Sequence, residues 1–166
     1  MADLYLMVGL PGSGKSTFLK NFVTKDTSVI ISRDEIRFSL LKEGEDYFSH
    51  EDEVVKIFWH KINEELAAGH DVFVDQTSIN PRSRKWLLKH VNGYDNANII
   101  WIDETLETCI KNNEKRKRTN RYVPIDTIIN MKEKFVEPSF LEEGFYRIYR
   151  YNSKTNKLSY IERTYV

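Results

Sequence analysis

The chain has 166 residues, and its 25 Lys plus Arg balance its 25 Asp plus Glu, so the formal net charge is zero. A hydrophobic content of 40% and an aromatic content of 13% exclude a disordered chain, and the length suits one domain over residues 1–166. Zero net charge excludes a protein that holds nucleic acid through bulk positive charge alone. The single cysteine, Cys109, excludes an internal disulfide and a zinc site built mainly from cysteine.

Short apolar runs alternate with helical patterns along the whole chain. The runs predict buried strands over residues 4–8, 29–31, 72–74, 99–102 and 145–151. This alternation predicts an α/β fold with a mostly parallel five-stranded sheet flanked by helices. Residues 152–157 predict a turn, and residues 158–166 would then complete a C-terminal β-hairpin. Residues 1–3 lack the basic start of a signal peptide, and no apolar stretch is long enough to predict a membrane span. We therefore expect a soluble intracellular protein.

Two of the predicted helices have clear boundaries. Apolar residues recur at every fourth position from Val54 to Leu66, and Gly69 follows as a stop signal. Asn80 and Pro81 suit the N-cap and the first position of a second helix, which continues to Gly93. Further helices are predicted near residues 105–117 and 125–135.

A phosphate-binding motif follows the first predicted strand. Residues 9–16 read Gly-Leu-Pro-Gly-Ser-Gly-Lys-Ser, which is the P-loop pattern, and a helical pattern comes next. Glycines let the backbone point its N–H groups at phosphate oxygens, while Lys15 reaches the terminal phosphates and Ser16 ligates Mg²⁺. We therefore expect ATP and Mg²⁺ as cofactors. The residues expected to bind the nucleotide here are Gly9, Pro11, Gly12, Ser13, Gly14, Lys15, Ser16 and Thr17.

The P-loop alone does not define the reaction. A GTPase would need a guanine-reading Asn-Lys-x-Asp stretch, which the sequence lacks, and a motor ATPase is usually larger. A P-loop kinase that transfers phosphate to a bound acceptor is therefore the favoured class.

Asp34 and Arg37 are the candidates for the acceptor side. Both follow the second predicted strand, and ligands of open parallel sheets bind at the carboxyl ends of strands. Asp34 could accept a proton from an attacking hydroxyl, and Arg37 could hold an anionic acceptor or orient Asp34. The alternative is structural, because Ser32 and Glu35 have capping-box spacing and an Asp at this position favours a helix N-terminus.

Asp75 ends the third predicted strand. A carboxylate there suits the Mg²⁺ side of a P-loop site, with a water between it and the ion, although a strand-end Asp can also serve a turn.

A basic segment lies between the last two predicted helices. Residues 111–121 contain six basic residues and one acid, whereas residues 42–65 contain eight acids and three bases. Such a run is often only a solvated helix face. Next to a phosphate site it predicts a helical lid over about residues 111–124, in which Arg116 and Arg121 contact the transferring phosphate.

Four blocks in this order resemble the phage polynucleotide 5′-hydroxyl kinases and their small P-loop kinase relatives. They are residues 9–17, 32–37, 77–84 and the run from 113 to 126. The chain departs from the family at Gln76, where an Asp is frequent, and at Asn112, where an Arg is frequent. It also lacks the Asp-x-Asp-x-Thr motif of the phosphatase domain that the bifunctional phage enzymes carry.

The resemblance implies roles for individual residues. Asp34 is similar to the general base that deprotonates a 5′-hydroxyl, Arg37 to the residue that positions the acceptor phosphate and the base, and Arg116 to the lid arginine that clamps the donor phosphates. It also implies that the P-loop strand lies beside the third strand. The substrate would be a nucleic-acid 5′-end of single-stranded DNA or RNA, in the cytoplasm of the host cell if the chain is phage-encoded.

Other functions remain open at this point. A small-molecule kinase for a nucleoside, nucleotide, sugar or antibiotic has the same core, and a non-catalytic nucleotide-binding module needs only the P-loop. Four aromatic residues near the acceptor side could stack on bases, although such residues more often pack in the core. They are Phe38, Tyr47, Phe48 and Trp59.

Overall fold

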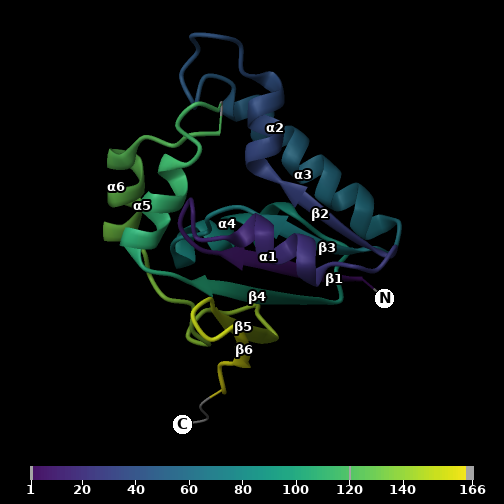
Figure 1. Cartoon of the computed structure of the whole chain (residues 1–166). Coiled ribbons are helices and arrows are strands. Elements are labelled where there is room, and N and C mark those ends of the chain that lie inside the picture. The colour runs from purple at the N-terminus through teal and green to yellow at the C-terminus, as the bar shows by residue number, and fades with distance from the viewer. Residues whose placement is uncertain (1, 120, 164–166) are drawn as a thin grey trace.

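A computed structural model of the chain describes residues 2–119 and 121–163. Within this part of the chain, six strands form one sheet in the order β2-β3-β1-β4-β5-β6 (Figure 1). The strands are β1 (Asp3–Val8), β2 (Ser28–Ser32), β3 (Asp71–Asp75), β4 (Asn96–Asp103), β5 (Arg147–Asn152) and β6 (Lys157–Tyr160). Strands β1 to β5 run parallel, and β1 lies between β3 and β4. The predicted parallel strands and the expected neighbour of β1 are therefore confirmed.

The C-terminal hairpin is present but shorter than the sequence predicts. Strand β6 runs antiparallel to β5 and pairs Tyr160 with Tyr149. Asn156 supplies the left-handed backbone of the turn, with φ 51°. The predicted last strand over residues 158–166 ends at Tyr160 instead, and residues 164–166 lie outside the described part of the chain.

The helices are α1 (Lys15–Phe22), α2 (Arg33–Leu40), α3 (Glu51–Ala67), α4 (Pro81–His90), α5 (Leu106–Glu114) and α6 (Ile125–Glu133). Helix α4 begins where predicted, because the Asn80 side chain accepts the Ser83 N–H at 2.9 Å. Helix α3 buries its every-fourth-residue stripe, whose members are Val54, Phe58, Ile62 and Leu66. None of the described helices is long and apolar enough to cross a membrane.

Apolar side chains on the two faces of the sheet form two separate cores. The larger core packs Phe58 of α3 and Leu87 of α4 against strand residues such as Leu6. The smaller core packs Leu19 of α1 against Met7 and Phe73 on the opposite face. In Figure 1, α1 lies in front of the sheet, α2 and α3 lie at the upper right, and α5 and α6 lie at the left. Residues that follow the carboxyl ends of β1 and β3 line one cavity together with residues of α2 and of the segment after α5.

A buried arginine joins the loop after β3 to the segment after α6. Arg84 is fully buried, and its guanidinium donates to the Ser78 carbonyl at 2.9 Å, the Val136 carbonyl at 2.5 Å and Glu142 at 2.7 Å. Burial lowers the pKa of Arg84, and Glu142 opposes that shift. Arg84, which belongs to the sequence block at residues 77–84, therefore stabilises the fold, whatever other residues of the block contact.

Candidate active site

The loop between β1 and α1 requires glycine at two positions. Gly12 and Gly14 adopt left-handed backbone angles, with φ 82° and 96°. A Cβ on Gly12 would lie only 2.3 Å from the carbonyl oxygen of Cys109, so α5 could not pack this closely on any other residue. The loop is thereby held directly against the helix that leads into the basic segment.

Lys15 lies inside the P-loop. Its ammonium donates to the carbonyl oxygens of Gly9 at 3.1 Å and Leu10 at 3.0 Å, and the residue is buried. Burial lowers the pKa of Lys15, while the carboxylates of Asp75 and Asp34 oppose that shift. A positive charge is therefore fixed at the position where the loop would receive phosphate groups.

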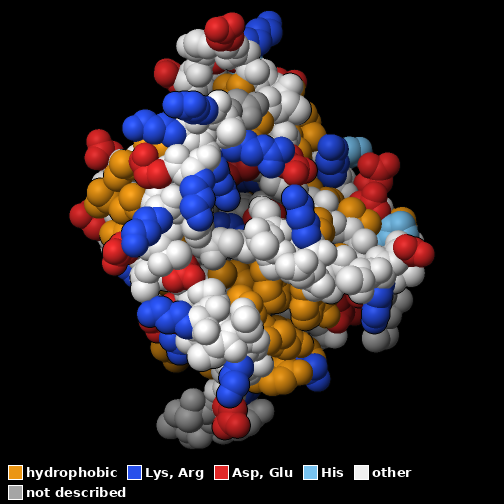
Figure 2. Space-filling view, viewed as in Figure 1, with side chains coloured by type: hydrophobic (Ala, Val, Ile, Leu, Met, Phe, Trp, Pro, Cys, Tyr) orange, Lys and Arg blue, Asp and Glu red, His pale blue; other side chains and the backbone are white. Residues whose placement is uncertain are grey.

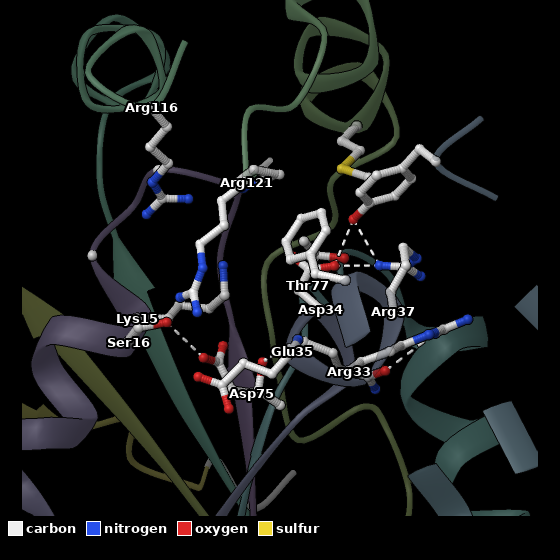
Figure 3. Close-up of a pocket in the computed structure, with 18 of the residues that line it drawn as sticks. Lys15, Ser16, Arg33, Asp34, Glu35, Arg37, Asp75, Thr77, Arg116 and Arg121 are labelled. Atoms are coloured by element: carbon white, nitrogen blue, oxygen red, sulfur yellow. Dashed lines mark hydrogen bonds and ion pairs between the residues drawn. The ribbon is translucent and has the colours of Figure 1, made fainter. Parts of the chain in front are cut away.

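Ser16, in the first turn of α1, meets Asp75 at the end of β3. The Ser16 hydroxyl donates to Asp75 Oδ2 at 2.7 Å, and Asp75 is buried at the end of β3 (Figure 3). Mg²⁺ prefers oxygen ligands and usually keeps several of its waters. A hydroxyl and a carboxylate beside the P-loop fit that ion, so the residues present suit the metal that the motif predicts.

These groups border a cavity of about 340 Å³ between the P-loop, α2 and the basic segment. In the space-filling view, Lys and Arg side chains gather beside this hollow (Figure 2). The residues predicted to act in catalysis, nucleotide binding or metal binding that line the cavity are Pro11, Gly12, Gly14, Lys15, Ser16, Thr17, Asp34, Arg37, Asp75, Arg116 and Arg121. Two residues of that predicted set do not line it: Gly9 contributes a carbonyl to Lys15, and Ser13 borders a neighbouring cavity.

Asp34 occupies the opposite side of the cavity from the P-loop (Figure 3). Its Oδ1 accepts a hydrogen bond from the Tyr47 hydroxyl at 2.6 Å and also pairs with Arg37. Its side chain is 45% exposed, and Oδ2 has no hydrogen-bond partner among residues 2–119 and 121–163. One carboxylate oxygen is therefore fixed by the protein, while the other is open to a ligand in the cavity.

Arg37 is buried and turned toward protein carboxylates. It binds both oxygens of Glu51, with Nη2–Oε1 at 2.8 Å and Nη2–Oε2 at 2.9 Å. It also donates to the Tyr47 hydroxyl at 2.7 Å. Burial is the main cause that raises the pKa of this hydroxyl. This geometry suits the expected orientation of Asp34, whereas a contact between Arg37 and an acceptor phosphate stays a prediction.

Sequence reasoning missed the residue that organises this side of the cavity. Glu51, the first residue of α3, binds Arg33 at 2.5 Å as well as Arg37, and Arg33 reaches the Gln76 amide oxygen at 3.3 Å. The spacing of the motifs gives no sign of Glu51. The usable signal is chemical, because an arginine buried in the core needs a carboxylate partner.

One side chain joins the residues on either side of the basic segment. Asn113 is fully buried, and its amide both donates to the Val123 carbonyl at 2.6 Å and accepts the Val123 N–H at 3.0 Å. Helix α5 ends at Glu114, earlier than the sequence predicts, because the chain then turns back toward Val123. In Figure 3, the side chains of Arg116 and Arg121 extend into the cavity near Lys15. At the same end of α5, Asn112 donates to the Gly12 carbonyl at 2.9 Å.

The fold and the site together define a P-loop protein with a phosphate-binding loop, an oxygen pair for a metal and a separate carboxylate across the cavity. Residues 4–138 match the AAA_33 family, which is described as an AAA domain. The chain belongs to this ATP-dependent P-loop kinase family.

Three known proteins illustrate the relationship. The L-seryl-tRNA(Sec) kinase of Methanococcus maripaludis is 31% identical over 143 residues, which cover 81% of this chain and 53% of that enzyme. A chain of the Pnkp1/Rnl/Hen1 RNA repair complex has 26% identity and a TM-score of 0.64, over 81% of this chain and 46% of its own length. A chain of the PezAT toxin–antitoxin system of Streptococcus pneumoniae shares the fold, with 22% identity, a TM-score of 0.65 and coverage of 96% and 71%. The chain thus spans about half the length of the first two relatives.

Proposed function

We propose that this chain transfers the γ-phosphate of ATP to a hydroxyl at the 5′-end of a polynucleotide, either DNA or RNA. The observation that carries the proposal is the half-exposed Asp34 carboxylate in the same cavity as Lys15 and the Ser16–Asp75 pair. A protein that only binds a nucleotide has no need of a positioned base on the acceptor side. The resemblance of the four sequence blocks to polynucleotide kinases and the relation to a chain of an RNA repair complex support a nucleic-acid acceptor.

On the donor side, the backbone N–H groups of the P-loop and the Lys15 ammonium bind the β- and γ-phosphates. Arg116 and Arg121 line the same cavity and add positive charge near Lys15 (Figure 3). Ser16 and Asp75 would hold Mg²⁺, which neutralises charge on the phosphates when it is bound. These residues stabilise the charge on the equatorial oxygens of the transferring group and exclude water from it.

On the acceptor side, Asp34 Oδ2 accepts the proton of the attacking hydroxyl. The hydroxyl oxygen then forms a bond to the γ-phosphorus, the bond from that phosphorus to the β–γ bridging oxygen breaks, and ADP leaves with the electron pair. Arg37 and Tyr47 hold Oδ1, so the free oxygen keeps its direction during proton transfer. In this proposal Arg37 is a positioning residue, since Glu51 occupies its remaining donors.

A second acceptor is favoured by one specific observation. The relative with 31% identity is a kinase for seryl-tRNA, so the hydroxyl of a serine attached to tRNA is the alternative nucleic-acid-linked acceptor. A small molecule remains the alternative outside nucleic acids.

Transfer of radiolabelled γ-phosphate tests these acceptors side by side. The panel contains 5′-hydroxyl DNA and RNA oligonucleotides, seryl-tRNA and a set of nucleosides, nucleotides, sugars and antibiotics. We expect labelling of the oligonucleotides, and we expect it to disappear in Asp34→Asn while ATP binding persists. Labelling of seryl-tRNA alone or of small molecules alone would overturn the polynucleotide proposal.

A further inference from the structure

The four aromatic residues near the acceptor side differ in what they can still contact. Trp59 stacks on His90 between α3 and α4, with ring centroids 3.9 Å apart, and it does not line the cavity. Tyr47 uses its hydroxyl on Asp34 and Arg37. Phe48 is 57% exposed, although it lines the cavity and directly follows Tyr47. Of the aromatic residues that line this cavity, Phe38 and Tyr47 are partly buried and Phe48 is exposed, so the Phe48 ring still has a face that a ligand can contact.

The Phe48 ring packs against two residues of the Asp34 network. Tyr47 packs against it edge to face, with centroids 4.7 Å apart and an interplanar angle of 90°. The Arg37 guanidinium lies 5.6 Å from its centroid. The residues that fix Asp34 therefore also fix the position of Phe48, so the exposed ring has a defined place relative to the proposed base.

We propose that Phe48 is the stacking platform for the nucleobase of the acceptor's terminal nucleoside, an inference that rests on the proposed function. A nucleoside whose hydroxyl reaches Asp34 Oδ2 carries its base a few ångströms away, which is the region that Phe48 borders. Stacking on a single aromatic ring accepts any base, because every base has a π-face. The site would therefore recognise a nucleoside end without reading its sequence.

The charges around Phe48 indicate on which side of the ring the rest of the acceptor lies. Beyond Phe48 a second cavity of about 290 Å³ is lined by the acidic residues Asp52 and Glu53, and also by Glu51, whose carboxylate is paired with Arg33 and Arg37. Phosphodiester groups are repelled there, whereas Arg116 and Arg121 border the main cavity. The acceptor backbone therefore leaves Phe48 away from the start of α3.

Steady-state kinetics on two matched acceptors test the proposal. Both are 5′-hydroxyl oligonucleotides, and the second has an abasic sugar as its 5′-terminal residue. Phe48→Ala and Phe48→Leu remove the ring, Phe48→Trp keeps an aromatic face, and Tyr146→Ala is the control, since Tyr146 is 53% exposed but lines none of the cavities described above.

With the intact acceptor, we expect Phe48→Ala and Phe48→Leu to raise KM about tenfold, within the roughly 5- to 150-fold range of a lost base–aromatic stack. The KM for ATP should not change, and Phe48→Trp should restore the KM for the oligonucleotide. With the abasic acceptor, wild type, Phe48→Ala and Phe48→Leu should have the same KM, because there is no base to stack. Tyr146→Ala should behave as wild type with both acceptors.

Two results would overturn the inference while leaving the proposed function intact. One is an unchanged KM of Phe48→Ala and Phe48→Leu for the intact acceptor, and the other is an equal loss on intact and abasic acceptors. Failure of the wild-type chain to label any oligonucleotide would instead overturn the proposed function itself. The circular dichroism spectrum and Tm of each variant show whether its fold is retained, which is expected because Phe48 is exposed.

Discussion

The two sides of the cavity are built in different ways. The donor side comes mostly from one continuous stretch, in which the P-loop places Lys15 and Ser16, and only Asp75 is added from β3. The acceptor side is assembled from α2, the following loop and the start of α3, through Asp34, Tyr47 and Glu51. Backbone geometry fixes the first side, and a network of side-chain ion pairs and hydrogen bonds fixes the second.

This difference has a consequence for how each side fails. Replacing Lys15 removes a charge from the phosphates but leaves the fold in place. A change in the acceptor network leaves a buried arginine without its partner, so it alters stability and reactivity together. Substitutions on the donor side should therefore lower kcat alone, whereas those that break the acceptor network should lower both kcat and the Tm.

The largest effect is expected from Lys15→Met. Removing a cation from the transferring phosphate should lower kcat roughly 10⁴-fold, by comparison with arginines that act on the same group. The Tm should not fall, because methionine fills similar space and no longer buries a charge. Phosphate-transfer rates and thermal unfolding measure both, with the exposed Lys25→Met as control. If Lys15→Met transferred phosphate at the wild-type rate, Lys15 would not act on the transferring phosphate, and the two sides of the cavity could not be compared in this way.

The next effect is expected from Asp34→Asn. An amide of the same size cannot accept the hydroxyl proton, so kcat should fall on the order of 10³-fold. The affinity for a non-hydrolysable ATP analogue should stay the same, because Asp34 lies across the cavity from the P-loop. Single-turnover transfer and analogue titration separate the two quantities. A loss of analogue binding would mean that Asp34 serves the donor side instead.

A smaller effect on the reaction is expected from Glu51→Gln. Arg33 and Arg37 would lose their shared carboxylate, and the side chain of Arg37 is only 5% exposed. Stability should fall by about 2 kcal/mol, less than for a fully buried pair, since the Glu51 side chain is 24% exposed. This loss corresponds to a Tm lower by about 5 °C, and kcat should fall about tenfold as Asp34 loses its fixed direction.

Glu142→Gln is the matched control for this prediction. It breaks the carboxylate pair of the fully buried Arg84 and should lower the Tm at least as much as Glu51→Gln. Because Glu142 does not line the cavity, kcat measured well below the Tm should remain unchanged. Equal kcat values for the two variants would show that Glu51 acts only on stability.

The smallest effect is expected from Asp103→Asn. Its ion pair with Arg150 joins β4 to β5, but the two side chains are 32% and 47% exposed. Exposed pairs contribute roughly 0.2–1 kcal/mol, so the Tm should shift by no more than about 3 °C and kcat should not change. A large loss of activity would mean that charge pairs outside the cavity also control the reaction.

The sequence predicted those parts of the molecule that depend on local spacing. The parallel strands, the P-loop and the start of α4 at Asn80 were all predicted correctly, because each is set by residues within a few positions of one another. Ser16 and Asp75 were both predicted on the Mg²⁺ side of the P-loop, and their side chains are in contact, while the metal role stays a prediction. Glu51 could not be found this way, because its contacts with Arg33 and Arg37 form only when α2 and α3 pack. The early end of α5 has the same origin, since it depends on the contact of Asn113 with a residue beyond the basic segment.

The double hydrogen bond between Asn113 and Val123 also sets the reach of the cationic segment. Because Asn113 and Val123 are joined by two hydrogen bonds, the start and the end of this segment are held together. The entropy of closing such a loop is already lost before a ligand arrives. Arg116 and Arg121, which line the same cavity as the P-loop, therefore belong to a segment whose two ends are already fixed.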